Sequence, residues 1–203
     1  MADAPKDTKQ LLIETATELI WSESYNAVSV DEICKKADVK KGSFYHFFPS
    51  KAHLAMEAMD YCMCNTKGHY DDLFSPTRPP LERFSLMVSY IIEQQKEISA
   101  QLGHVCGCPF ATLGSELAGQ DELIGKKINE ICAKKTAYYQ SALRDLMVEG
   151  LISSETDVVA KSHDIFAFIV GHLIMARIHN DLGFIENHME KSLLDLIGIN
   201  RHI

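Results

Sequence analysis

Apolar residues recur at helical spacing along most of the chain, and the breaks between these runs mark the elements. The first run, residues 11–20, predicts an amphipathic helix over residues 7–22. Residues 29–32 (SVDE) form a capping-box pattern, in which the serine and glutamate side chains each satisfy an unpaired backbone N–H at the start of a helix. We therefore expect a short second helix there, a turn at Asp38, and a third short helix over residues 40–48.

The rest of the chain is also helical in pattern, and no strand signal or internal repeat compares with it. Pro49-Ser50-Lys51 interrupts the pattern, and Ser50 is a good N-cap for a long helix. Residues 157–180 are apolar nearly all round, which is typical of a helix buried on several sides. The predicted helices span about residues 50–74, 81–99, 121–149, 157–180 and 184–199, with one short, interrupted helix within 103–119.

These elements predict an all-α protein of two parts. Three short helices with a tight turn between the last two have the helix-turn-helix geometry, whose final helix can enter a major groove of DNA. We expect this N-terminal domain to span residues 1–49. Residues 50–203 would form a second, α-helical domain.

The charge of the chain is unevenly distributed. The formal net charge of −8 at pH 7 argues at first against nucleic acid, because DNA affinity comes from Lys and Arg at phosphates. Residues 1–51 hold seven Lys and eight Asp or Glu, a net charge of −1, so −7 belongs to residues 52–203. The first part contains a local basic patch made of five lysines: Lys35, Lys36, Lys40, Lys41 and Lys51.

The sequence indicates neither a membrane segment nor catalytic chemistry. No stretch has the roughly 18–20 uninterrupted apolar residues of a membrane span, and the polar start MADAPKDTKQ lacks a signal-peptide core, so we expect a cytoplasmic protein. The six cysteines are too scattered for a disulfide framework and are expected to be reduced thiols. We find no nucleophile elbow, phosphate loop or metalloprotease signature, and we expect no enzyme, no cofactor and no bound metal.

The segment Ser29 to Leu54 (SVDEICKKADVKKGSFYHFFPSKAHL) resembles the DNA-binding segment of the tetracycline-repressor (TetR/AcrR) family. The shared pattern is a Ser or Thr, an Ile-led pair, an Ala-x-Val turn, then Gly-Ser-aromatic-Tyr, a Phe and Ser-Lys. The chain departs from it at three positions: Asp38 replaces a common Gly, Phe47 a common Tyr or His, and Ala52 the usual Glu. Aspartate tolerates a left-handed conformation better than most residues, so we expect the turn to persist.

The resemblance implies a transcriptional repressor that binds a near-palindromic operator as a homodimer and is released by a small-molecule or thiol-reactive effector. The last two helices would pair with their symmetry mates in a four-helix bundle. The half-sites would then lie roughly 34–36 Å apart. The residues expected to face DNA are Ser29, Lys40, Lys41, Gly42, Ser43, Tyr45, His46 and Lys51.

The acidic remainder is similar to the family's effector-binding and dimerisation domain. Within it, the Gly107-Cys108 pair before a short helix resembles a subgroup of which some members respond to electrophiles or oxidants. The two cysteines at 106 and 108 are interpreted as structural or pocket-lining residues, as a sensor thiol at Cys108, or, with His104, as an incomplete metal site. The candidate effector-binding residues are Cys106, Cys108, Phe110, Tyr138, Phe168 and His172.

Two alternatives to an effector-released repressor remain open. One is a regulator that senses oxidants or electrophiles through cysteine. The other is an architectural DNA binder with no effector pocket.

Overall fold

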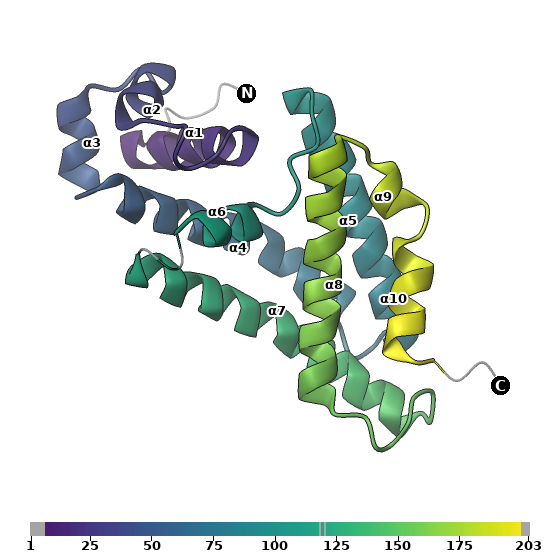
Figure 1. Ribbon diagram of the computed structural model, residues 1–203. Helices are drawn as coiled ribbons and strands as arrows, with labels where there is room; N and C mark the ends of the chain where they lie inside the picture. Colours follow the sequence, from purple (N-terminus) through teal and green to yellow (C-terminus); the bar gives the residue numbers. More distant parts are fainter. Residues whose placement is uncertain (1–6, 118, 120, 200–203) are drawn as a thin grey trace, which may run out of the picture. The chain divides into compact units, whose positions relative to one another are not determined.

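The computed structural model describes residues 7–117, 119 and 121–199, which form ten α-helices and no β-strand (Figure 1). The all-α prediction is confirmed. The helices are α1 (Thr8–Ser22), α2 (Val30–Lys36), α3 (Lys41–Phe47), α4 (Lys51–Leu73), α5 (Pro80–Leu102), α6 (Pro109–Leu117), α7 (Glu122–Val148), α8 (Val158–His179), α9 (Gly183–Glu186) and α10 (Met189–Ile197).

The chain forms two compact units whose members are not contiguous in sequence. The first contains the residues up to Thr66 together with Pro109–Ile128, and the second contains Lys67–Cys108 together with the residues from Asn129 onward. Helices α4 and α7 therefore each contribute to both units. The domain boundary expected after residue 49 separates DNA-binding residues from the rest of the chain, which is a different division from that into compact units. It stays a prediction.

Local signals explain the first helices of unit 1. Ser29 Oγ accepts from Glu32 N at 3.1 Å while Ser29 N donates to a Glu32 carboxylate oxygen at 2.6 Å, so the predicted capping box is present. Asp38 has φ 52°, and Val39 N donates to Cys34 O at 2.9 Å, which ends α2 in a left-handed turn without glycine. The turn expected at Asp38 is confirmed.

The core of unit 1 joins the three short helices to the start of α4. Phe44 and Phe48 lie inside, their ring centroids 5.8 Å apart, among buried side chains from α1, α2 and α4. Of the apolar residues that helical spacing placed on one face of α1, Leu12, Ala16, Leu19 and Ile20 are buried and Leu11 is half-buried; Ile13 is buried as well. The buried apolar residues of unit 1 are Leu12, Ile13, Ala16, Leu19, Ile20, Val28, Ile33, Cys34, Ala37, Phe44, Phe48, Leu54, Ala55, Ala58, Met59, Leu113, Leu117 and Ile124.

The core of unit 2 gathers apolar side chains of α5, α7, α8 and α10 with the end of α4. Phe84, Tyr139 and Phe74 form its aromatic part, with ring centroids 5.7–6.4 Å apart. The buried guanidinium of Arg83 is satisfied by Asp145 at 2.5 Å and by the carbonyls of Arg78 and Pro76. The predicted last helix of about 184–199 is divided by a turn into α9 and α10.

Helix α8 corrects one expectation from sequence. Its buried residues, among them Ile165, Ile169 and Leu173, follow one stripe, and the opposite face of the helix is exposed within the chain. The prediction that this segment is buried on several sides is therefore wrong for the single chain. Helix α8 is also long enough and apolar enough to cross a membrane, but the core helix of a soluble protein can have the same length and composition.

Candidate functional site

The outer face of α3 presents most of the residues predicted to contact DNA. Phe44 and Phe48 anchor the helix inward, which turns Tyr45 outward, where 53% of its surface is exposed. Exposed residues at helix positions i, i+1, i+4 and i+5 share one face. The exposed residues of this surface are Lys40, Lys41, Gly42, Tyr45 and His46, with Ser43 half-buried beside them.

The three lysines predicted to contact DNA have different surroundings. Lys40 is exposed, whereas the Lys41 ammonium lies 2.7 Å from a carboxylate oxygen of Asp31 at the start of α2. Lys51 Nζ donates to the carbonyls of Tyr25 and Val28, both at 2.8 Å, and its burial lowers its pKa. A phosphate contact from Lys51 would have to use its remaining N–H or replace one of these bonds, and the contact stays a prediction.

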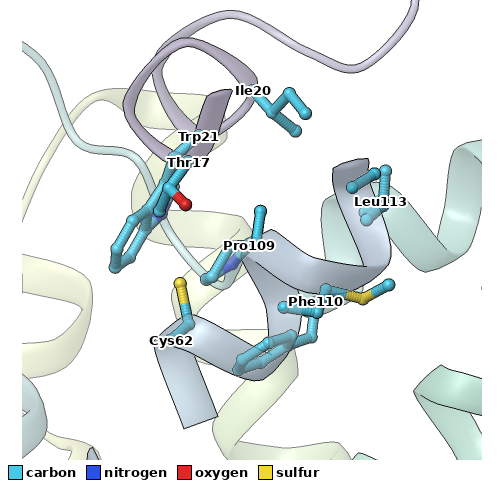
Figure 2. Close-up of a pocket in the computed structure, with 10 residues that line it drawn as sticks. Thr17, Ile20, Trp21, Cys62, Pro109, Phe110 and Leu113 are labelled. Carbon is cyan, nitrogen blue, oxygen red and sulfur yellow. The ribbon is translucent and has the colours of Figure 1, made fainter. Parts of the chain in front are cut away.

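A small apolar pocket lies between α1, α4 and α6 inside unit 1 (Figure 2). Trp21 and Thr17 of α1 form one wall, and Cys62 of α4 lies at its edge. Pro109 and Phe110 of α6 form the opposite wall. The structure therefore places Phe110 in unit 1, whereas the other five candidate effector residues belong to unit 2.

Polar contacts also join α6 and the first turns of α7 to the remainder of unit 1. A carboxylate oxygen of Glu116 accepts from the backbone N–H of Asn26 at 3.1 Å. The ammonium of Lys127 donates to both carboxylate oxygens of Asp60, at 2.8 and 2.9 Å. The segment 109–128 therefore packs with α1, the loop that follows it and α4, which no sequence pattern indicated.

The Cys106-Gly107-Cys108 segment is pinned to two helices of unit 2. The Gln95 side chain of α5 accepts from Gly107 N at 3.0 Å and donates to Gly107 O at 3.2 Å. From α8, Arg177 donates to Cys106 O at 2.9 Å. Gly107 itself has φ 70°, and a Cβ there would lie 2.9 Å from Leu173 O, so the close approach to α8 requires glycine.

Replacing Gly107 with alanine should destabilise the chain more than the matched replacement at Gly150. Gly150 has nearly the same positive φ of 71°, but a Cβ added there would meet no atom within 4 Å, so Gly150→Ala reports backbone strain alone. We expect about 1 kcal/mol for Gly150→Ala, and about 1–3 kcal/mol more for Gly107→Ala because of the added clash. Urea unfolding of the two variants measures both; equal losses would mean that the loop moves freely away from α8.

The two cysteines of this segment differ in environment. Cys106 is fully buried with its Sγ 3.7 Å from His104 Nε2, and burial raises its thiol pKa, although the charge of Arg177 opposes that shift. A raised pKa disfavours the reactive thiolate. Cys108 is half-buried and lies close enough to the Lys135 ammonium to interact electrostatically with it.

No metal centre emerges from this segment. Among the residues that the structure describes, no three His, Cys, Asp or Glu side chains are close enough together to hold a metal ion. The alternative of a metal site built on His104, Cys106 and Cys108 therefore gains no support.

The remaining candidate effector residues lie on α7 and α8. The half-buried Tyr138 donates its hydroxyl to a carboxylate oxygen of Asp71. The rings of Phe168 and His172 lie 4.1 Å apart, and the imidazole Nδ1 is 3.0 Å from Phe168 O. The contacts of Tyr138 and those of Phe168 and His172 are separate, so they do not join these three candidate effector residues in one site.

Several buried polar residues of unit 2, in addition to Arg83, were not predicted from sequence. Lys135 and Gln95 are buried, and the hydroxyl of Tyr70 interacts with that of Tyr139 inside the core. No motif marks such residues, since each sits at a helical position that a solvent-exposed residue could equally occupy.

Comparison with known proteins identifies the class. Residues 12–58 match the model of bacterial regulatory proteins of the tetR family, and residues 87–190 match that of the tetracyclin repressor-like C-terminal domain. The chain thus belongs to the TetR family of transcriptional regulators. The resemblance seen at Ser29–Leu54 is confirmed, whereas membership of the Gly-Cys subgroup stays a prediction.

Individual relatives extend over most of the chain. An uncharacterised HTH-type transcriptional regulator of Lactococcus lactis is 26% identical over 199 residues, covering 95% of this chain and 96% of its own. The HTH-type transcriptional repressor KstR of Rhodococcus jostii is 25% identical and covers 75% of this chain and 70% of its own. The crystal structure of reduced Escherichia coli NemR superposes with a TM-score of 0.79 at 20% identity, covering 97% of this chain and 100% of that one.

Proposed function

We propose that the chain is a cytoplasmic transcriptional repressor that binds a near-palindromic operator as a homodimer and releases it when an effector binds unit 2. The observation that carries the proposal is the outer face of α3, where exposed basic and aromatic side chains surround Gly42, whose missing side chain lets backbone approach DNA. Ser29 and Lys51 are proposed as flanking phosphate contacts. The relatives are regulators, and we assign the chain no catalytic role.

The homodimer is supported by the uncovered face of α8. Beside the exposed His163 and Asp164, this face carries mostly small and apolar side chains, which is unusual for a surface that meets only water. Small residues at its centre would let a second helix approach closely, and Ile178 at one end is 67% exposed. The exposed apolar or small residues of the face are Val159, Ala160, Ala167, Gly171, Met175 and Ile178.

Transmission of effector binding is supported by the packing of residues 109–128 with α1 and α4, in the unit that contains α3. The chain crosses from unit 2 to unit 1 between Cys108 and Pro109, directly after the segment that Gln95 and Arg177 hold. A shift of that segment would therefore move α6, which follows it directly in the chain. In α6, the Glu116 carboxylate accepts a hydrogen bond from Asn26 N, so the shift would reach the loop after α1. An effector with different affinity for the two arrangements then shifts operator occupancy.

Replacing Asp31 with asparagine should strengthen operator binding. In the free chain Asp31 holds the ammonium of Lys41 and would repel a nearby phosphate, so its neutral isostere frees the lysine and removes one negative charge. We expect affinity to rise about 3- to 10-fold at low salt, with a smaller gain at high salt. Fluorescence anisotropy across a salt series measures it.

The matched control is Glu18→Gln, which frees Lys36 from an equivalent exposed ion pair on α1. It should change operator affinity less than about twofold, since Lys36 is not among the proposed contacts. If Asp31→Asn weakens binding, Lys41 is not a phosphate contact.

A cysteine-based sensor is the second candidate function, favoured by the half-buried Cys108 beside the Lys135 ammonium. Operator release by hypochlorite or an electrophile should then be lost in Cys108→Ser and kept in Cys64→Ser, which removes an exposed thiol of α4. Release that persists unchanged in Cys108→Ser excludes this mechanism. An architectural DNA binder, in contrast, would show no operator preference at all.

A further inference from the structure

Lys135 is a buried cation in the core of unit 2. Only 9% of its surface is exposed, and its Nζ lies 3.2 Å from the ring centroid of Tyr70. Among the described residues, no Asp or Glu oxygen comes within the 4.0 Å of an ion pair with this ammonium. The face of an aromatic ring attracts a cation, but it supplies no full negative charge.

The surroundings of the lysine do not supply that charge either. Burial raises the pKa of both Tyr70 and Tyr139, so these hydroxyls stay neutral at physiological pH. Burial of Lys135 lowers its pKa from 10.5 to about 7. Within the described part of the chain, Cys108 is the one titratable group whose charge raises this pKa, and its effect is smaller than that of burial. A buried ammonium without a counter-ion is unfavourable, and an apolar side chain of similar size would serve the core better.

Aromatic side chains surround Lys135 in the core of unit 2. Tyr70 stands 5.6 Å from Tyr138 and 6.0 Å from Phe74, measured between ring centroids, and Tyr139 stands 5.7 Å from Phe74. A ligand that reaches Lys135 would therefore meet one positive charge and several apolar ring surfaces. The cation that contacts this cluster is Lys135, whereas Arg83 donates to Asp145 and Arg177 to Cys106 O, so a single negative charge suits the site better than a phosphate dianion.

We propose that Lys135 binds the carboxylate of a small monocarboxylic acid, whose apolar body packs against the rings of Tyr70, Tyr138 and Tyr139. The inference deepens the proposed function, on which it rests, by giving the effector of unit 2 a chemical class. The carboxylate supplies the missing counter-charge, and the bound lysine is fully protonated. None of the six effector residues predicted from sequence is a lysine or an arginine.

The test compares carboxylates with alcohols of equal length on operator-free protein. Isothermal titration calorimetry measures butanoate, hexanoate, octanoate and 3-phenylpropanoate against the corresponding primary alcohols. The wild-type chain should bind at least one acid about tenfold more tightly than its alcohol, and Lys135→Met should lose that preference while keeping the affinity for the alcohol within about threefold. Lys134→Met, which removes an exposed lysine from the same helix, should behave as wild type.

Three results would overturn the inference: equal affinity of acid and alcohol for the wild-type chain, a preference for the acid that survives in Lys135→Met, or no binding of any of the four acids. Thermal unfolding establishes that Lys135→Met folds, and its midpoint should be equal to or above that of wild type because an unpaired charge is removed.

Operator affinity measured on the same preparations separates this inference from the proposed function. A wild-type chain that prefers acids through Lys135 but has no operator preference contradicts the proposed function and leaves the carboxylate site intact. A chain that binds its operator but does not distinguish acids from alcohols contradicts the carboxylate site alone.

Discussion

Replacing Ala167 with glutamate should convert the dimer to a monomer and abolish tight operator binding. Ala167 lies in the middle of the exposed face of α8, so the change leaves the packing within the chain intact. In a two-fold interface the variant places two copies of the new carboxylate in the same buried contact, and two buried, unpaired charges cost several kcal/mol. We expect dimer dissociation to become at least about 100-fold more favourable, and operator affinity to fall by a similar factor.

Sedimentation velocity measures the association state, and Ala133→Glu is the matched control. Ala133 is also exposed, but it lies on α7 away from the proposed interface, so this variant should remain a dimer. A dimeric Ala167→Glu variant with unchanged operator affinity would mean that the chains associate through another surface. Circular dichroism should show equal helix content in both variants.

Replacing Phe44 with alanine should have the largest effect on the stability of the DNA-binding helices. Its side chain is fully buried and packs against Phe48, so truncation removes apolar contact and leaves a cavity. Phe to Ala changes in cores cost about 3–5 kcal/mol. The variant should lose operator binding because α3 is no longer held, and chemical denaturation followed by circular dichroism should show an early transition.

Tyr45→Ala, one residue further along α3, should instead weaken operator binding with little loss of stability. Tyr45 is largely exposed, and its contact with Phe44 is edge-on at 5.1 Å, so we expect a stability loss below about 1 kcal/mol. Operator affinity should nevertheless fall about 10-fold or more, since the residue is proposed to meet DNA. A Tyr45→Ala variant with normal operator affinity would remove this residue from the interface.

The helices could be predicted from sequence because local chemistry determines where they begin and end. The capping box at Ser29 and Glu32 uses only neighbouring residues, and so does the left-handed turn at Asp38. The inward position of Phe44 and the outward position of Tyr45 follow from helical periodicity. The candidate DNA surface needed little more than these signals and the family resemblance.

Local sequence signals did not predict how the helices after residue 49 pack together. That residues 109–128 join the first unit depends on contacts such as Lys127 with Asp60, which are far apart in sequence. Helix α8 looked buried on several sides because its free face is as apolar as its core face, and composition does not distinguish a core from an interface between chains. The isolation of the Lys135 charge is likewise a product of tertiary packing.

The most direct test of a dimeric, sequence-specific DNA-binding regulator is selection of DNA from a random duplex pool by the purified chain, followed by the stoichiometry of the selected complex. We predict enrichment of an inverted repeat with half-sites about one helical turn apart, bound by two chains per duplex. Retention of DNA without any enriched sequence, or one chain bound per selected site, would contradict a dimeric and sequence-specific regulator.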